Sequence, residues 1–287
     1  MDKLNSRWFT EVSHCSGTAF SLKIHKKIKT VQTPYQTIEM FETNEFGYLM
    51  AIDGSIMLTT RDNFFYHEML AHCAVLTHDH PKSVVIIGGG DCGTLNEILK
   101  YSNVESVTQI DIDEQVTRLS EIYFPELCQR NNDPRATLLF QDGIKWIEDA
   151  PDASLDIIII DSTDPGGPSE GLFVENFYHQ CKRALKPDGL LMQQSESPLI
   201  HTNILISMRR AMLKAGFEHQ LTIPFPQPVY QSGWWSATMA SASRNVRHAR
   251  VTDMAEFKLK FYNSAIHQAA FTPQPIIQAI DDAVFAP

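Results

Sequence analysis

The chain has 287 residues, 43% of them hydrophobic and 20% charged, a balance typical of an ordinary globular protein with one or two domains. Its net charge of −10 comes from 34 acidic and 24 basic side chains, which repels phosphate backbones and argues against nucleic acid as a partner. The N-terminus lacks the apolar run of a signal peptide, and no apolar run is long enough to span a bilayer. We therefore expect no membrane partner and a cytoplasmic location.

The five cysteines are scattered along the chain and form no C-x-x-C pair. This pattern predicts neither a disulfide framework nor a metal site.

Residues 20–60 predict a small antiparallel sheet of two or three hairpins. Apolar and polar residues alternate loosely from Thr37 to Thr60, and turn signals such as Asp53-Gly54 interrupt the pattern. We expect an N-terminal β domain over residues 1–62, and Asp62 as the acidic cap of the helix that follows. The apolar residues of that helix recur at helical spacing: Phe65, Met69, Cys73 and Leu76.

After Pro81 the pattern changes to alternating strands and helices. The strand candidates cover residues 83–88, 106–111, 136–142, 155–161 and 189–195, with a late strand at 234–240. Helical segments separate them, at 93–100, 113–124, 143–149 and 172–184. This alternation predicts an α/β fold over residues 63–287, a methyltransferase-like Rossmann domain whose mostly parallel sheet carries helices on both faces. The Ile-rich strand at 155–161 suits a buried central position.

A glycine-rich turn follows the first of these strands. Residues 88–93 satisfy G-x-G-x-x-G, and Asp111 ends the next strand 23 positions after Gly88. An acid there can accept hydrogen bonds from ribose hydroxyls, so the pair predicts an adenosine-containing ligand. Asp91 lies inside the turn, where a carboxylate would repel the pyrophosphate of a dinucleotide. A nicotinamide-dependent dehydrogenase is therefore disfavoured, and a sulfonium nucleoside is favoured.

Acidic residues also follow the remaining strands. Ligands bind beyond the carboxyl ends of parallel strands, so five carboxylates should converge on one crevice: Asp91, Asp111, Asp142, Asp161 and Asp164. Helix capping can explain some acids, with Asp113 and Asp142 as the candidates. It does not explain five together, because uncompensated carboxylates repel one another. The crevice is expected to bind a polycation.

Several motifs resemble those of the spermidine synthase family of polyamine aminopropyltransferases, over nearly the whole chain. They are DGSIMLTTRDNFFYHEM (53–69), IIGGGDCG (86–93), Asp142-Gly143, DSTDPGGP (161–168), VYQSGWWS (229–236) and FYNSAIHQAAF (261–271). The resemblance implies transfer of an aminopropyl group from decarboxylated S-adenosylmethionine, a co-substrate, to a diamine, with putrescine the first expectation. The chemistry of this transfer requires no metal or bound cofactor. The resemblance also implies at least a dimer, so we expect a homodimer or homotetramer.

The resemblance also implies roles for individual residues. Asp161 would accept the proton, with Tyr66 beside it, and Asp91 would bind the amino end of the aminopropyl chain. The diamine site would comprise His67, Asp91, Asp161, Ser162, Thr163, Asp164, Gln194, Tyr230 and Trp235. The nucleoside site would comprise Lys23, Gly88, Gly90, Asp91, Asp111, Ile112, Asp142, Gly143 and Pro168. The chain departs from the family pattern at Lys23, Met57, Cys92, Asn96 and Asp111.

Two alternatives share most of these features. An N-methyltransferase that uses S-adenosylmethionine would have the same fold, but Asp91 would then face the methionine carboxylate; Lys23 could relieve that repulsion. A polyamine-binding relative without turnover is the other alternative, and the intact pair Asp161 and Asp164 argues against it. The sequence leaves open whether the diamine is putrescine, cadaverine, agmatine or spermidine.

Overall fold

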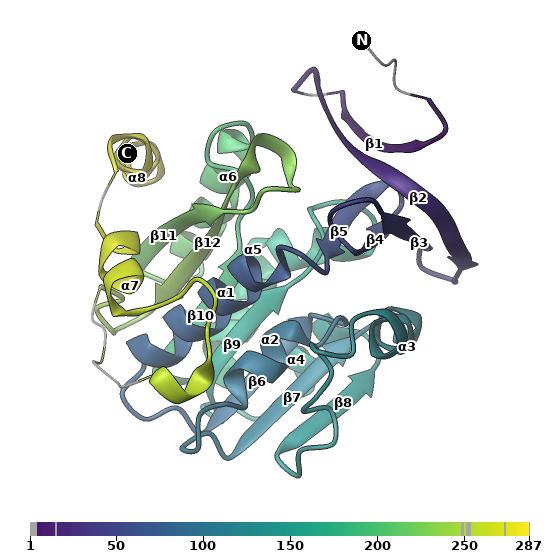
Figure 1. Ribbon diagram of the computed structural model, residues 1–287. Helices are drawn as coiled ribbons and strands as arrows, with labels where there is room; N and C mark the ends of the chain where they lie inside the picture. Colours follow the sequence, from purple (N-terminus) through teal and green to yellow (C-terminus); the bar gives the residue numbers. More distant parts are fainter. Residues whose placement is uncertain (1–4, 15, 248–249, 251–253, 273, 287) are drawn as a thin grey trace.

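The computed structural model describes residues 5–14, 16–247, 250, 254–272 and 274–286. Within these ranges the chain forms an antiparallel sheet followed by a larger, mostly parallel sheet with helices, as expected from the sequence (Figure 1). Across the described residues, none of the helices has the length and apolar character needed to cross a membrane.

The N-terminal sheet has five strands, each antiparallel to the next along the chain. They are β1 (Trp8–Ser13), β2 (Thr18–Gln32), β3 (Thr37–Thr43), β4 (Tyr48–Ile52) and β5 (Ser55–Thr59). The expected alternation is clear in β3, where Ile38 and Met40 are fully buried. These side chains pack with Leu119 and Phe124, at and beside helix α3 (Glu114–Tyr123), so the first sheet rests on the second unit. Strand β1 was not expected from the sequence.

The larger sheet has the strand order β11-β12-β10-β9-β6-β7-β8. Its strands are β6 (Ser83–Gly88), β7 (Ser106–Asp111), β8 (Ala136–Phe140), β9 (Leu155–Asp161), β10 (Leu185–Gln194), β11 (His219–Pro226) and β12 (Trp234–Ser241). Strands β6 to β10 are parallel, and β12 and β11 add an antiparallel edge. The chain order reverses between β6 and β9, which makes their carboxyl ends a topological switch point.

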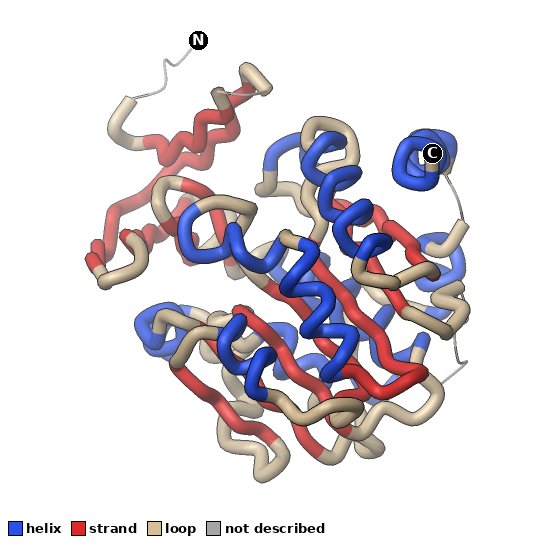
Figure 2. Tube along the Cα trace, turned by 180° about the vertical axis from the view of Figure 1, so that it is seen from behind, coloured by secondary structure: helices blue, strands red, loops and turns tan. Residues whose placement is uncertain are grey.

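Helices cover both faces of this sheet (Figures 1 and 2). They are α1 (Asn63–Thr77), α2 (Gly93–Ile98), α3, α4 (Gly143–Asp149), α5 (Glu175–Ala184), α6 (Thr202–Lys214), α7 (Ser264–Ala270) and α8 (Pro275–Phe285). Strand β9 alternates between the two layers. Ile157 and Ile159 pack with α1 and α2, whereas Ile158 and Ile160 pack with α4, α5, α6 and α8. The expected central position of this strand is confirmed.

Helix boundaries give one correction and one refinement. Asp62 stands at the N-cap of α1, but its carboxylate makes no capping bond. It accepts instead from Thr59 Oγ1 at 2.5 Å and from Val229 N–H at 3.2 Å, which ties the first sheet to the β11–β12 loop. The helix expected over 172–184 is interrupted, because Val174 is extended and separates a 3₁₀ turn (Gly167–Phe173) from α5.

Two other acids are true caps. Asp113 accepts from Gln115 N–H at the start of α3, and Asp142 accepts from Ile144 N–H and Lys145 N–H at the start of α4. Capping by these two residues was a sequence-based alternative, and it is confirmed.

Candidate active site

The principal cavity opens at the switch point between β6 and β9 and encloses about 1090 Å³, including space open to solvent. A second cavity of about 440 Å³ adjoins it. The two share lining residues, namely Met57, Tyr66, Ser162, Thr163 and Tyr230. The larger volume suits a nucleoside-sized ligand, and the smaller one suits a short linear molecule.

The glycine turn after β6 is pressed against the end of β9. Gly88 and Gly89 have φ of 84° and 67°, a left-handed conformation that favours glycine. A Cβ on Gly88 would lie 2.2 Å from the carbonyl oxygen of Asp161, and Gly89 N–H donates to that oxygen at 2.7 Å. The turn therefore fixes the backbone of Asp161 at the cavity wall.

The carboxylate of Asp161 is held from two sides. Tyr66 Oη donates to its Oδ1 at 2.7 Å, and Thr94 Oγ1 donates to its Oδ2 at 2.6 Å. Burial and the charge of Asp91 raise the pKa of Asp161 to about 6, while the charge of His67 and the two hydroxyl bonds act in the opposite direction. Asp161 is thus mostly ionised at neutral pH and is a stronger base than an ordinary aspartate.

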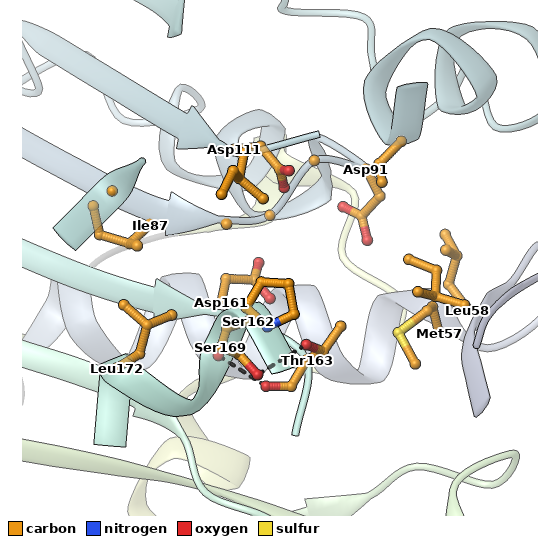
Figure 3. Close-up of a pocket in the computed structure, with 18 of the residues that line it drawn as sticks. Met57, Leu58, Ile87, Asp91, Asp111, Asp161, Ser162, Thr163, Ser169 and Leu172 are labelled. Atoms are coloured by element: carbon orange, nitrogen blue, oxygen red, sulfur yellow. Dashed lines mark hydrogen bonds between the residues drawn. The ribbon is translucent and has the colours of Figure 1, made fainter. Parts of the chain in front are cut away.

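His67 and Asp91 form an ion pair beside Asp161. His67 Nε2 lies 3.1 Å from Asp91 Oδ2, and Asp91 Oδ1 accepts from Gly93 N–H at 2.7 Å. Burial opposes a charge on the imidazole, but the charge and hydrogen bond of Asp91, together with Asp161, raise the pKa of His67 to about 9. One imidazolium, that of His67, therefore lies beside the two carboxylates of Asp91 and Asp161, which leaves this junction with an excess of negative charge. Figure 3 shows both carboxylates at the cavity.

Asp111 also lines the larger cavity, next to Gly90 of the glycine turn, and Figure 3 shows it together with Asp161. Its Oδ1 accepts from Asp113 N–H at 2.8 Å, and a Cβ on Gly90 would lie 2.6 Å from its Oδ2. Burial, followed by the charge of Asp113, raises the pKa of Asp111 to about 6 against the backbone bonds that lower it. The turn therefore has no space for a side chain at Gly90, and the cavity beside Asp111 stays open to a ligand.

The second cavity has aromatic walls and an acidic end. Trp235 Nε1 donates to Gln194 Oε1 at 3.2 Å, and Tyr230 Oη donates to the Met57 carbonyl at 2.5 Å. Glu11 and Asp164 both line the cavity. Loss of solvent around its carboxyl group, and then Glu196, raise the pKa of Asp164 well above its usual range, although the residue as a whole is exposed.

Glu196 lies behind this end of the cavity and is only 1% exposed. Burial raises its pKa to about 7 despite the hydrogen bond with Asp164. Its φ is 65°, so the backbone holds this glutamate in a conformation uncommon for a non-glycine residue. Its Oε2 lies 2.7 Å from His201 Nδ1, and His201 lines the cavity itself.

The structure brings nearly all of the expected site residues together. The larger cavity is lined by Tyr66, His67, Gly88, Gly90, Asp91, Asp111, Ile112, Asp142, Gly143, Asp161, Ser162, Thr163, Pro168 and Tyr230. The smaller cavity adds Asp164, Gln194 and Trp235. Lys23 is the exception: it is exposed on β2 and lies outside both cavities. As a result, this structure gives no support for a donor-binding role for Lys23.

Other lining residues were missed by the sequence analysis. They include Glu11, Gln36, Asn63, Gln227, Gln231 and His201. Glu11 lies on the unexpected strand β1, and Gln231 Nε2 donates to its Oε1 at 3.0 Å across a separation of 220 residues. A polar residue that becomes part of a site only through such a distant contact carries no local signal. His201 was detectable in principle, because it follows β10 on the ligand-binding edge of the sheet.

A Rossmann-like sheet with an acidic cavity at its switch point is typical of an α/β protein that binds a cationic ligand at the carboxyl ends of its strands. Comparison with known families identifies the family. Residues 63–250 match the spermine/spermidine synthase domain, and residues 7–60 match the spermidine synthase tetramerisation domain. The chain belongs to the spermine/spermidine synthase family, which confirms the resemblance seen in its motifs.

Individual relatives cover almost the entire chain. The polyamine aminopropyltransferase of Xylella fastidiosa is 54% identical over 276 residues, which is 95% of this chain and 97% of that protein. The corresponding protein of Methylococcus capsulatus is 56% identical and covers 92% of this chain and 93% of its own length. A crystal structure of spermidine synthase with the transition state analogue AdoDATO has a TM-score of 0.90, with 32% identity over 97% of this chain and 96% of that one.

Proposed function

We propose that this chain, an aminopropyltransferase by family, transfers the aminopropyl group of decarboxylated S-adenosylmethionine to putrescine and releases spermidine and 5′-methylthioadenosine. The observation that carries the proposal is the set of half-buried carboxylates at the junction of the two cavities, where Asp91 and Asp161 face one imidazolium, that of His67. Buried charge without compensation is unfavourable, and a sulfonium with an ammonium group supplies the missing positive charge.

The donor is assigned to the larger cavity. Asp111 is placed to accept from the ribose hydroxyls, in line with its position at the end of β7. Asp142 uses its Oδ1 to cap α4, which leaves Oδ2 for the adenine edge, with Gly143 N–H beside it. Ile112 and Pro168 line the same part of the cavity, and Asp91 would bind the ammonium of the aminopropyl chain.

The diamine is assigned to the smaller cavity. Gln194, Tyr230 and Trp235 form its walls. The aromatic faces of Tyr230 and Trp235 suit both methylene groups and an ammonium. Glu11 and Asp164 would receive the distal ammonium, while Ser162 and Thr163 lie near the reacting nitrogen. Tyr66, one of the five residues that line both cavities, would lie where donor and acceptor meet.

The reaction is then an in-line displacement. The lone pair of a neutral amine attacks the carbon next to the sulfonium, a C–N bond forms, and the C–S bond breaks with its electron pair passing to sulfur. The displacement gives a secondary ammonium, which passes one proton to the carboxylate of Asp161; the raised pKa of Asp161 suits a proton acceptor near neutral pH. Alignment of the two substrates in adjoining cavities supplies much of the remaining acceleration.

The proposal extends to organisation and location. The boundary between the domains is placed at residue 62, with domains over 1–62 and 63–287, because β5 ends at Thr59 and α1 begins at Asn63. We assign the enzyme to a homodimer or homotetramer, supported by the match of residues 7–60 to a tetramerisation domain. A cytoplasmic location is supported by the described cysteines, all four of which are free.

The test is an incubation with decarboxylated S-adenosylmethionine and a mixture of putrescine, cadaverine, agmatine and spermidine, followed by mass spectrometry. Parallel tubes contain ordinary S-adenosylmethionine. Methylthioadenosine with aminopropylated putrescine as the main product is the expected result. Methylated amine with S-adenosylhomocysteine in the parallel tubes would instead indicate an N-methyltransferase. Binding of both substrates without product would indicate a polyamine-binding relative.

A further inference from the structure

Thr94 is a buried contact of the proposed proton acceptor that neither the motifs nor the family comparison assigns. It is the second residue of α2, directly after the glycine turn, and it is 0% exposed. Its hydroxyl donates to Asp161 Oδ2 at 2.6 Å. Thr94 does not line either cavity, whereas Tyr66, the other donor to this carboxylate, lines both. Any influence of Thr94 on substrate must therefore pass through Asp161.

The local structure explains why this hydroxyl points to Asp161. A threonine near a helix end commonly bonds the carbonyl four residues earlier. For Thr94 that carbonyl belongs to Gly90, and it already accepts from Thr117 Oγ1 of α3 at 2.8 Å. Because Gly90 lies outside α2, its carbonyl is not in the position of a helical i−4 acceptor, and the Thr94 hydroxyl donates instead across the turn to Asp161. The bond between Thr94 and Asp161 therefore depends on the close approach of the glycine turn after β6 to the end of β9.

We propose that Thr94 is a positioning residue that fixes the rotation of the Asp161 carboxylate and keeps it ionised for the attacking amine. This inference rests on the proposed function of Asp161. With Oδ1 bonded to Tyr66 and Oδ2 bonded to Thr94, the plane of the carboxylate is set, and each oxygen keeps one lone pair for another donor. An amine entering from the cavity meets those lone pairs in one orientation only.

The charges around Asp161 make the contribution of this hydroxyl measurable. The ionisable groups that face Asp161 come from four elements: Tyr66 and His67 of α1, Asp91 of the turn, Asp111 of β7, and Tyr230 of the β11–β12 loop. Burial and Asp91 raise the pKa of Asp161, while His67 and the hydrogen bonds of Thr94 and Tyr66 lower it. Removal of the Thr94 hydroxyl therefore raises this pKa further.

The experiment compares three variants in the full-length enzyme. Thr94→Val keeps the shape and removes the hydroxyl; Thr94→Ser restores it. Thr117→Val is the matched control, since it removes a buried threonine hydroxyl of α3 that bonds the Gly90 carbonyl of the same turn and makes no bond to Asp161. The acid limb of kcat/KM is expected to move up by about one pH unit in Thr94→Val, since a hydrogen bond to a charged group has about that effect. The donor KM should stay within about twofold, because the residue does not touch the ligand.

A second measurement reports the ionisation of Asp161 without turnover. Carbon NMR of labelled aspartate, with Asp161→Asn to assign the resonance, should show the same upward movement in Thr94→Val and its reversal in Thr94→Ser. An unchanged titration of Asp161 in Thr94→Val, or an equal movement in Thr117→Val, overturns the inference. If the wild-type enzyme gives no aminopropylated product, the proposed function fails, and the NMR titration still decides whether Thr94 controls this carboxylate.

Discussion

The charge of Asp161 is expected to lower the stability of the unliganded fold, and Asp161→Asn separates this effect from catalysis. Asparagine has nearly the same shape, and it can keep both hydrogen bonds, because the hydroxyls of Tyr66 and Thr94 can accept from an amide as well as donate to a carbonyl. Only the negative charge disappears. We therefore expect the variant to be more stable than the wild type near neutral pH and far less active.

The magnitude follows from the pKa. In the folded protein the pKa of Asp161 is raised from 3.8 to about 6, so protonation favours the folded state. As the pH rises above 3.8, the unfolded chain ionises first, and the fold loses stability until the pH passes about 6. At about 1.4 kcal/mol per pH unit, the loss is about 3 kcal/mol above pH 7 and about half of that near pH 5.

The assay is urea unfolding of the unliganded enzyme at a fixed protein concentration. Asp161→Asn should gain about 2–3 kcal/mol over the wild type near pH 7.5, equivalent to roughly 5 °C or more in Tm, with a smaller gain near pH 5. Its turnover should fall by about 10²–10⁴, the range for loss of a general base. Asp149→Asn, at an exposed position of α4, is the control and should change stability by less than about 0.5 kcal/mol. A less stable Asp161→Asn, or a gain that is the same at both pH values, would show that the charge of Asp161 does not destabilise the unliganded fold.

Three further substitutions test other parts of the site. Tyr66→Phe removes one hydroxyl bond to the proton acceptor and should lower kcat by about 10–100-fold with a small change in donor KM; equal effects on both constants would contradict its assigned position. Glu68→Ala removes an acceptor shared by the three backbone N–H groups of residues 260–262 and should lower the unfolding free energy by about 3 kcal/mol. Hydrogen exchange should then rise at those amides, and unchanged protection there would count against this anchor. Gly93→Ala places a Cβ about 2.3 Å from the imidazole of His67 and should cut activity by more than about tenfold while circular dichroism shows the fold retained; near-normal kinetics would show that the histidine can move without consequence.

The fold was predictable where each element carries its own signal. Strands β6 and β9 begin and end at the residues that their apolar runs indicated, because a buried parallel strand contains a nearly continuous hydrophobic segment. Strand β7 also has the expected bounds, although its sequence is mixed, because it follows in the strand–helix alternation. Strand β1 carries no such signal, since its partly exposed residues depend on pairing with β2 for their place in a sheet. The break at Val174 was equally unpredictable, because a 3₁₀ turn and an α-helix have similar apolar spacing.

The candidate site was also predictable only in part, where a residue follows the end of a strand. Residues at strand ends, such as Asp91, Asp111 and Asp161, could be assigned from chain order, because parallel strands bring their carboxyl ends to one edge. Glu11 and Thr94 could not. Glu11 reaches the cavity only through the packing of the first sheet, and Thr94 reaches Asp161 only because the turn brings two distant backbones into contact.

Cys92 occupies a strained backbone position in the glycine turn. The residue has a φ of 68°, in the region that favours glycine, and it is fully buried. A non-glycine residue in that conformation costs about 1–2 kcal/mol, which the surroundings must offset. Gln109 Nε2 donates to its sulfur at 3.5 Å, and the sulfur in turn lies 3.6 Å from the Gly90 carbonyl. The backbone strain at Cys92 therefore lies between Asp91 and Thr94, the two residues of this segment that contribute to the site. The strained turn and the neighbouring charges both destabilise the unliganded fold. This combination indicates that the sequence is adapted to the liganded state rather than to the stability of the unliganded fold.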